Sequence, residues 1–176
     1  MLERAARDVP PGAEGLLFLP YLMGERSPIW DAKASGVFVG LGLHHGRGHL
    51  YRAVLEGIAC ALRHNIETSR SQQALDDALV VVGGASRSEL WMQIVADITG
   101  RPVRTIEEDV EASLGAAMLA ALGIGLIDRA DAARGWVRLL DRARPVQAAQ
   151  LRYEKLYAQY VALYPAIRNV MHALKD

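Results

Sequence analysis

The stretch "VVVGGASRSELWMQIVADITG", from Val80 to Gly100, joins three kinds of local sequence. β-Branched residues at its start predict a strand, the Gly-Gly pair predicts a turn, and the apolar spacing after Ser88 predicts a helix. Ser88 is a suitable N-cap, and Gly100 suits the left-handed residue that ends a helix. We therefore expect Val80–Val82 to be a central strand, with Gly84 at its C-terminal end and the helix rising from about Ser88.

A strand, a Gly-Gly turn and a helix N-terminus are open to two interpretations. Glycine lets the backbone approach a ligand closely, and the unpaired N–H groups at a helix N-terminus favour phosphate. The same residues also make an ordinary turn between two elements. Neither the P-loop pattern nor the dinucleotide-binding G-x-G-x-x-G is present, so the local pattern leaves both a ligand site and a structural turn open.

Strands and helices alternate along the rest of the chain, which predicts a layered α/β domain. Pro165 lies inside the last apolar-periodic segment and is expected to kink or split that helix. We expect strands at Gly15–Leu22, Gly36–Leu43, Ala78–Gly84 and Arg101–Ile106, and helices at His49–Arg70, Ser88–Gly100, Glu111–Gly125 and Gln147–Leu174.

The helix expected from His49 to Arg70 is amphipathic. Gly57 falls on its apolar side, where a missing side chain permits close packing, and Cys60 is expected to be a buried, inert thiol. The opposite side, which we expect to face solvent, carries Arg52, Glu56, Arg63, Glu67 and Arg70.

The composition excludes several classes of protein. With 51% hydrophobic and 23% charged residues, the chain of 176 residues can bury a core. Its formal net charge of +0 gives no basic field for nucleic acid or an anionic membrane. The longest uncharged apolar stretch, Leu114–Ile127, is shorter than the ~17–25 residues of a spanning helix. The N-terminal residues have no apolar core of a signal peptide, and a single cysteine fits a reducing cytoplasm.

Two polar segments could in principle carry chemistry. "HHGRGH" holds His44, His45 and His49, but no cysteine or carboxylate cluster accompanies them, so we interpret it as a solvated turn and assign no metal ligand. "GERSPIWD" reads as a loop, in which the simplest interpretation is an ion pair between Glu25 and Arg26 that fixes the backbone.

The order of the motifs is more specific than any one of them. The segment "GVFVGLGLHHGRGHLYRAVLE" resembles a signature of the FGGY carbohydrate kinases, the family of xylulokinase and glycerol kinase. Further segments resemble that family's C-terminal half in the same order: "LPYLMGERSPIWD", "GGASRSELWMQIVADITGRPV", "EASLGAAMLAALGIG" and "RPVQAAQLRYEKLYAQYVALYP". The signature positions are Gly36, Phe38, Gly40, Leu41, His49, Leu50, Ala53, Val54, Leu55 and Glu56, and the resemblance covers roughly Gly15 to Ile167.

The resemblance implies an actin-like, ribonuclease-H-like ATPase domain with a mixed sheet flanked by helices. It places the kinase domain at residues 15–176 and makes residues 1–14 a lead-in from a preceding region. In the family, the positions of Gly84 and Ser88 hold the adenine nucleotide, and the helix from Glu111 through Gly115 is expected to pack behind them. Ala85 stands where many members have a third glycine. The implied nucleotide-binding residues are Gly83, Gly84, Ala85, Ser86 and Ser88.

The implied function is transfer of the γ-phosphate of ATP, with Mg²⁺, to a hydroxyl of a pentulose or polyol. The family's catalytic Asp and first phosphate loop belong to its N-terminal domain and match nothing before Gly15, so we assign no catalytic residue and expect the isolated chain to be inactive. The implied partners are an adenine nucleotide, that N-terminal domain, a small sugar and a second copy in a homo-oligomer. The alternatives are a non-catalytic, actin-like regulatory module and an α/β domain whose Gly-Gly turn is structural.

Overall fold

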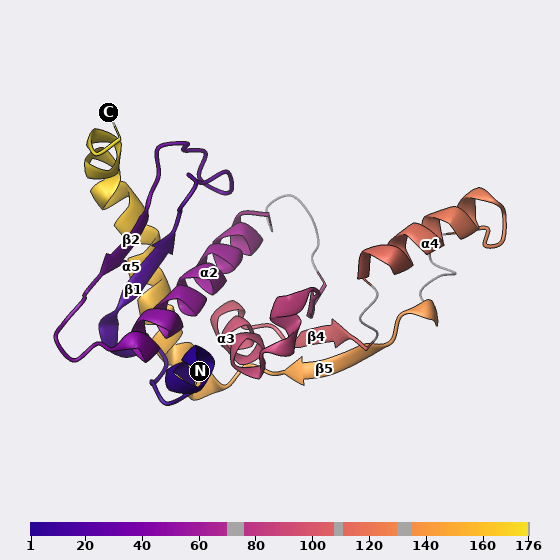
Figure 1. Cartoon of the computed structure of the whole chain (residues 1–176), viewed down its shortest axis with the longest axis horizontal. Coiled ribbons are helices and arrows are strands. Elements are labelled where there is room, and N and C mark those ends of the chain that lie inside the picture. The colour runs from indigo at the N-terminus through magenta and orange to yellow at the C-terminus, as the bar shows by residue number, and fades with distance from the viewer. Residues whose placement is uncertain (70–75, 108–110, 130–134, 176) are drawn as a thin grey trace.

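A computed structural model describes residues 1–69, 76–107, 111–129 and 135–175 (Figure 1). The long helices α2 and α5 lie with a small sheet at one end of the molecule, and a second sheet and α4 extend toward the other end. The elements in chain order are α1 (Leu2–Arg7), β1 (Leu17–Pro20), β2 (Gly36–Val39), α2 (Arg47–Ser69), β3 (Leu79–Val81), α3 (Glu89–Thr99), β4 (Val103–Ile106), α4 (Glu111–Gly123), β5 (Leu139–Ala143) and α5 (Gln147–Ala173), with short 3₁₀ turns at Ala13–Gly15 and Gly84–Arg87.

The first sheet confirms the two predicted strands near Gly15–Leu22 and Gly36–Leu43. It also confirms that Gly57 permits close packing of α2. β1 and β2 are antiparallel, and the rings of Phe18 and Phe38 lie opposite each other with centroids 4.5 Å apart. Helix α2 crosses β1 at Gly57, where an added Cβ would lie 2.2 Å from the carbonyl oxygen of Phe18. The absence of a side chain at Gly57 therefore sets the distance between helix and strand, as the sequence indicated.

The second sheet has the order β3-β4-β5, with β3 parallel and β5 antiparallel to β4. The prediction that Val80–Val82 is a central strand is wrong for the described residues, because β4 occupies the centre and β3 the edge. Val80 and Val82 are accordingly 50% and 49% exposed. The outer strand β5 was not predicted, because its residues "LLDRA" show no clean alternation of apolar and polar side chains.

Helix α4 stands apart from the glycine loop (Figure 1). Beyond its own helix, no described heavy atom lies within 4 Å of the position that a Cβ on Gly115 would take. Leu119 and Ile124 are 72% and 80% exposed. The prediction that this helix packs behind the loop is therefore wrong for the described residues. Apolar residues occur on all sides of α4, so no single face directs it onto the sheet.

Helix α5 confirms the predicted last helix but is not split at Pro165. The helix runs unbroken from Gln147 to Ala173 with Pro165 inside it. Pro165 is exposed, so water can reach the carbonyl group that its ring deprives of a hydrogen bond. The tyrosines are buried on the opposite side of the helix, against the core, at positions Tyr153, Tyr157, Tyr160 and Tyr164.

The prediction of a solvent-facing Arg52 and Glu56 is wrong. The two residues are only 5% and 1% exposed, and Arg52 Nε donates to Glu56 Oε1 at 2.7 Å. The same carboxylate oxygen accepts from the Tyr153 hydroxyl at 2.8 Å and the Gly12 N–H at 3.0 Å. Burial raises the pKa of Glu56 above its ordinary value, although Arg52 acts against that shift. Hydrogen bonds from distant segments compensate for the cost of burying this ion pair. The sequence of α2 alone could not predict them.

Residues 1–14 are attached to the same network. Arg52 Nη1 donates to the carbonyl oxygens of Ala6 and Val9, at 3.2 and 2.8 Å. Gly48 brings α2 close to α1, because an added Cβ there would lie 2.5 Å from the Ala5 carbonyl oxygen. The start of the described chain is therefore packed onto α2, while its division into a lead-in and a domain stays a prediction.

Asp31 fastens the loop between β1 and β2 to the end of α5. Its Oδ2 accepts from the Tyr164 hydroxyl at 2.5 Å and lies 2.7 Å from His172 Nε2. Hydrogen bonds from Tyr164 and His172 hold the pKa of the Asp31 carboxyl well below its usual range. The carboxylate form is thus favoured by the fold, and its protonation opposes folding.

We expect the contribution of Asp31 to stability to depend on pH in the acid range. The pKa of Asp31 in the folded chain lies below its value of about 3.9 in the unfolded chain, so on acidification the unfolded chain binds the proton first. The contribution of Asp31 to stability is therefore full above about pH 3.9 and is lost as the pH falls toward the lower folded pKa. Urea unfolding should show Asp31→Asn less stable than wild type at pH 7, with a smaller difference at pH 3. Asp128→Asn, at an exposed site, is the control. An Asp31→Asn difference that is equal at both pH values would contradict this mechanism.

The described helices include none that is both long and apolar enough to cross a membrane. Cys60 is fully buried, and burial raises the pKa of its thiol, which confirms the expected inert core cysteine.

Candidate functional site

The glycine loop follows β3, and its first glycine has a conformation that other residues avoid. Gly83 has φ 87° and ψ −179°, a combination that is essentially restricted to glycine. The chain then enters a 3₁₀ turn over Gly84–Arg87. Ser86 N donates to Gly83 O at 2.9 Å and Ser88 N donates to Ala85 O at 3.2 Å. Gly83 is therefore required by the path of the backbone.

The second glycine has no such internal reason. Gly84 does not have a positive φ, and apart from its two chain neighbours no heavy atom of the described residues lies within 4 Å of the position where its Cβ would be. Gly84 and Ala85 are both exposed. A side chain at Gly84 would thus extend into open space beside the loop. The missing side chain leaves bare backbone there that another molecule can approach closely.

Ser88 ends the loop and starts α3. Its Oγ accepts a hydrogen bond from Trp91 N at 3.1 Å, as the sequence predicted for an N-cap. A hydroxyl has one donor and two acceptor positions, so this bond leaves the Ser88 O–H available to donate. The backbone N–H groups of Glu89 and Leu90 have no partner within the helix, because they belong to its first turn. The site therefore offers donors next to exposed backbone.

Helix α3 carries this loop and is held at its C-terminal half. Asp97 Oδ1 accepts from Val146 N at 2.8 Å and from Gln93 Nε2 at 2.9 Å. Burial raises the pKa of Asp97, against the effect of these two hydrogen bonds. Gly100 ends the helix with φ 68°, which confirms the predicted left-handed residue. Asp97 thus joins α3 to the beginning of α5.

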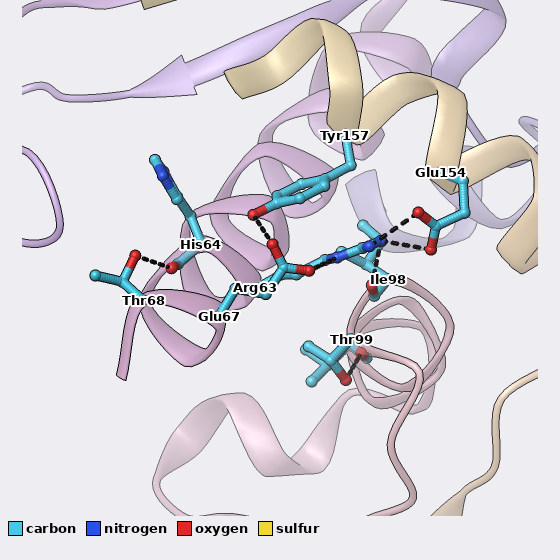
Figure 2. Close-up of polar contacts among 9 residues, drawn as sticks. Arg63, His64, Glu67, Thr68, Ile98, Thr99, Glu154 and Tyr157 are labelled. Carbon is cyan, nitrogen blue, oxygen red and sulfur yellow. Dashed lines mark hydrogen bonds and ion pairs between the residues drawn. The ribbon is translucent and has the colours of Figure 1, made fainter. Parts of the chain in front are cut away.

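A second anchor of α3 is the guanidinium of Arg63 on α2 (Figure 2). Arg63 Nη1 donates to the Ile98 carbonyl at 3.2 Å, and its two terminal nitrogens bind the Glu154 carboxylate at 2.8 and 2.9 Å. The guanidinium also lies 4.1 Å from the centre of the Tyr157 ring. Arg63 therefore connects α2, α3 and α5 at the end of α3 opposite the loop.

Sequence reasoning missed the role of this cluster. Arg63 and Glu67 are four residues apart and form the helix-surface pair that such spacing predicts, with an Nε–Oε1 distance of 2.9 Å. The Tyr157 hydroxyl closes the cluster by donating to Glu67 Oε2 at 2.8 Å. Only the pair within α2 had a local signal, because Glu154 and Tyr157 lie about ninety residues further along the chain.

The remaining polar candidates serve the fold. Glu25 Oε1 accepts from the backbone N–H groups of Arg26 and Ser27, at 2.7 and 3.1 Å, so the expected ion pair of Glu25 with the Arg26 guanidinium is wrong. A carboxylate gains more from two fixed backbone donors beside it than from a flexible, solvated guanidinium. His49 Nε2 lies 3.0 Å from Glu14 Oε2. No group of three metal-ligating side chains occurs among the described residues.

The sequence matches the C-terminal domain of the FGGY family of carbohydrate kinases over residues 1–124. It is 34% identical to the xylulose kinase of Bacillus subtilis over 169 residues, which cover 96% of this chain and 34% of that protein. It is also 34% identical to a gluconokinase of Bacillus licheniformis, over 96% of this chain and 33% of that protein. The chain thus spans about a third of the length of the relatives that it matches.

Solved structures give the same result for the fold. The crystal structure of xylulose kinase from Rhodospirillum rubrum superposes with a TM-score of 0.84 at 37% identity, over 97% of this chain and 34% of that one. The ligand-bound xylulose kinase of Lactobacillus acidophilus gives a TM-score of 0.86 at 32% identity, over 95% and 34%. These neighbours confirm the expected actin-like, mixed α/β fold. The chain belongs to the FGGY family of carbohydrate kinases and corresponds to its C-terminal domain.

Proposed function

We propose that the chain is the ATP- and ADP-binding part of a sugar kinase that transfers the γ-phosphate of ATP to a hydroxyl of a pentulose or polyol, in the manner of xylulose kinase. Membership of the family and the xylulose kinases among its relatives support this assignment. The remaining parts of the proposed site, the catalytic base and most sugar contacts, would come from an N-terminal kinase domain. We place the kinase in the cytoplasm, because a single buried cysteine, Cys60, suits a reducing compartment.

The open backbone at Gly84 carries this proposal. Gly83 is explained by its own φ and ψ, whereas Gly84 has no conformational reason of that kind, and its exposed backbone beside the start of α3 supports a nucleotide lying there. The nucleotide would rest on Gly83, Gly84, Ala85 and Ser86 and accept a hydrogen bond from Ser88. Ala85, in place of a third glycine, adds one exposed methyl group, which the open surroundings can accommodate.

Mg²⁺ would accompany ATP in this reaction and neutralise charge on its phosphates. The described residues gather no set of three side chains that suits the ion. We therefore assign no Mg²⁺ ligand to them, and the phosphates themselves would hold the ion together with the rest of the kinase. The part played by this chain is to bind and orient the nucleoside end.

Titration of ADP into ¹⁵N-labelled chain tests the proposed site. Amide shifts should be centred on Gly84–Ser88, and Gly84→Val should raise the dissociation constant about tenfold or more, equivalent to about 1.4 kcal/mol, because its side chain fills the space that the ligand needs. Gly46→Val is a matched control, since open space also surrounds Gly46. Shifts that occur only elsewhere, or equal effects of the two valines, would count against the site.

A further inference from the structure

The N-terminus of α2 is capped by a histidine side chain. Gly46 is the N-cap, because its carbonyl oxygen accepts the first helical hydrogen bond, from Leu50 N at 3.2 Å. His49 is the third residue of the helix, and its Nδ1 accepts from Gly46 N at 3.1 Å. In a capping box the side chain at this position, usually Glu or Gln, binds the N-cap N–H in the same way. His49 therefore closes a capping box with an imidazole nitrogen.

His45 makes the same kind of bond four residues earlier. Its Nδ1 accepts from Gly42 N at 2.8 Å, while Gly42 O accepts from His45 N at 3.1 Å. A backbone N–H only donates, so Nδ1 must be unprotonated in both His45 and His49. Each neutral ring then carries its hydrogen on Nε2. The two bonds, which we call the histidine caps, thus exist in one charge state and one tautomer of each ring.

The two Nε2–H groups have different surroundings. His49 Nε2 lies 3.0 Å from Glu14 Oε2, which can accept its hydrogen. His45 Nε2 is buried and has no hydrogen-bond partner among the described residues. The centroids of the His45 and His49 rings are 5.2 Å apart, and the ring of His44 lies 4.0 Å from that of His45. A charge on any one of these rings is therefore close to the other two.

Protonation is incompatible with the histidine caps. An imidazolium ion carries a hydrogen on both nitrogens, so its Nδ1 cannot accept from a backbone N–H. The positive end of the α2 dipole and Arg47 in the first turn also oppose a cation, whereas Asp8 and Glu14, which line the same hollow as His49, favour one. A charge on His49 is thus partly balanced, but in the described part of the chain no carboxylate is bonded to His45.

We propose that His45 and His49 form a pH-sensitive fastening of residues 42–49, which is closed while both rings are neutral and is opened by their protonation. Histidine is the side chain whose charge changes between about pH 5 and 8. The open form binds more protons than the closed form, so acidification favours the open form. Opening would also weaken the attachment of residues 1–14, because His49 contacts Glu14 and Arg52, one turn later, binds the Val9 carbonyl. The fastening and the glycine loop share no residue.

NMR of the unmodified chain tests the charge states and the opening. At about pH 8, the ring nitrogen resonances of His45 and His49 should show the hydrogen on Nε2. At about pH 5, the Gly42 and Gly46 amides should be protected at least about tenfold less against hydrogen exchange, after correction for the intrinsic rate, because one linked proton gives a factor of ten per pH unit. The Gly100 amide, which donates to Ala96 O at the end of α3, is the internal reference.

Asparagine variants separate the cap from its pH dependence. Asn Oδ1 lies as many bonds from Cα as His Nδ1, and it accepts a hydrogen bond without titrating. The Gly42 amide in His45→Asn and the Gly46 amide in His49→Asn should therefore keep their protection at the lower pH. His44→Asn is the matched control, because the His44 ring contacts His45 but, in the described part of the chain, accepts no backbone hydrogen bond. It should keep the pH dependence of the unmodified chain.

A hydrogen on Nδ1 of His45 or His49 at about pH 8 would overturn the proposal, as would protection of Gly42 and Gly46 that does not change with pH. A pH dependence that persists in both His45→Asn and His49→Asn, or that disappears in His44→Asn, would overturn the assignment to these two rings. If an asparagine variant also loses the Gly100 protection, its fold has failed, and the ring spectra and amide protection of the unmodified chain decide the result.

Discussion

The purified chain, mixed with ATP, Mg²⁺ and D-xylulose, is expected to release no ADP above the background without sugar. Phosphoryl transfer requires a carboxylate within hydrogen-bond reach of the acceptor hydroxyl, which contributes about 10²–10⁴-fold to the rate. Without the N-terminal domain the two substrates are not held in line with each other, which lowers the rate further. Turnover should therefore fall below detection even if the nucleotide binds.

Four described carboxylates support this expectation because each is engaged by another part of the fold. Glu56 is buried with Arg52, and Asp31 is bound by Tyr164. Asp97 accepts a hydrogen bond from the Val146 N–H before α5, and Glu107 pairs with Arg138 at 3.2 Å. None of these four is poised to remove a proton from a sugar beside the glycine loop. Glu108 and Asp109 lie outside the described residues.

A coupled assay of ADP release decides the question. D-Xylulose, L-ribulose, glycerol and erythritol are the acceptors, and Gly84→Val is the control for contaminating kinases. Sugar-dependent ADP release that Gly84→Val abolishes would show that the chain carries its own catalytic base. No release, together with ADP binding at Gly84–Ser88, is the result that the proposed function requires.

Arg52→Ala is expected to destabilise the chain by about 3–5 kcal/mol, the usual cost of leaving one member of a buried ion pair uncompensated. A domain is stable by only about 5–15 kcal/mol, so this loss would remove a large part of its free energy of unfolding. Arg52 also satisfies the carbonyl oxygens of Ala6 and Val9 and the hydroxyl of Tyr153. Its loss therefore loosens the attachment of residues 1–14 as well.

Urea unfolding of two further variants makes the test specific. Arg104→Ala removes a partner from an exposed pair, Arg104 with Asp141 at 2.8 Å, and should cost at most about 1 kcal/mol. The double variant Arg52→Met with Glu56→Gln removes both buried charges and should recover much of the stability lost in Arg52→Ala. Equal losses in Arg52→Ala and Arg104→Ala would contradict the idea that burial gives Arg52 its importance.

Features that depend on neighbours along the chain were predictable. The segment from Val80 to Gly100 specified its strand, its turn, its N-cap at Ser88 and its C-terminal glycine, because each involves residues within four positions of one another. The order of the motifs likewise indicated the FGGY family, which the match over residues 1–124 confirms. The nucleotide-binding role of the glycine loop stays a prediction of that resemblance.

Features that depend on segments far apart in the chain could not be obtained in this way. Arg52 and Glu56 were expected in solvent, because they fall on the side of the helix opposite its apolar residues. Their burial depends on Gly12 and Tyr153, which come from opposite ends of the chain. The helix expected behind the loop, α4, has no single apolar face, so its sequence could not say where it would lie.

The sequence by itself therefore determined the longer helices, four of the five strands, the two caps of α3 and the family, since local backbone preferences and the spacing of apolar residues act over one or two turns. Only the tertiary structure decided which strand forms the edge of a sheet and which charges are buried. It also separated the two glycines of the loop. Gly83 is needed because its φ and ψ are restricted to glycine, whereas the space around Gly84 is open. Both properties depend on the path of the folded backbone, which the local sequence does not fix.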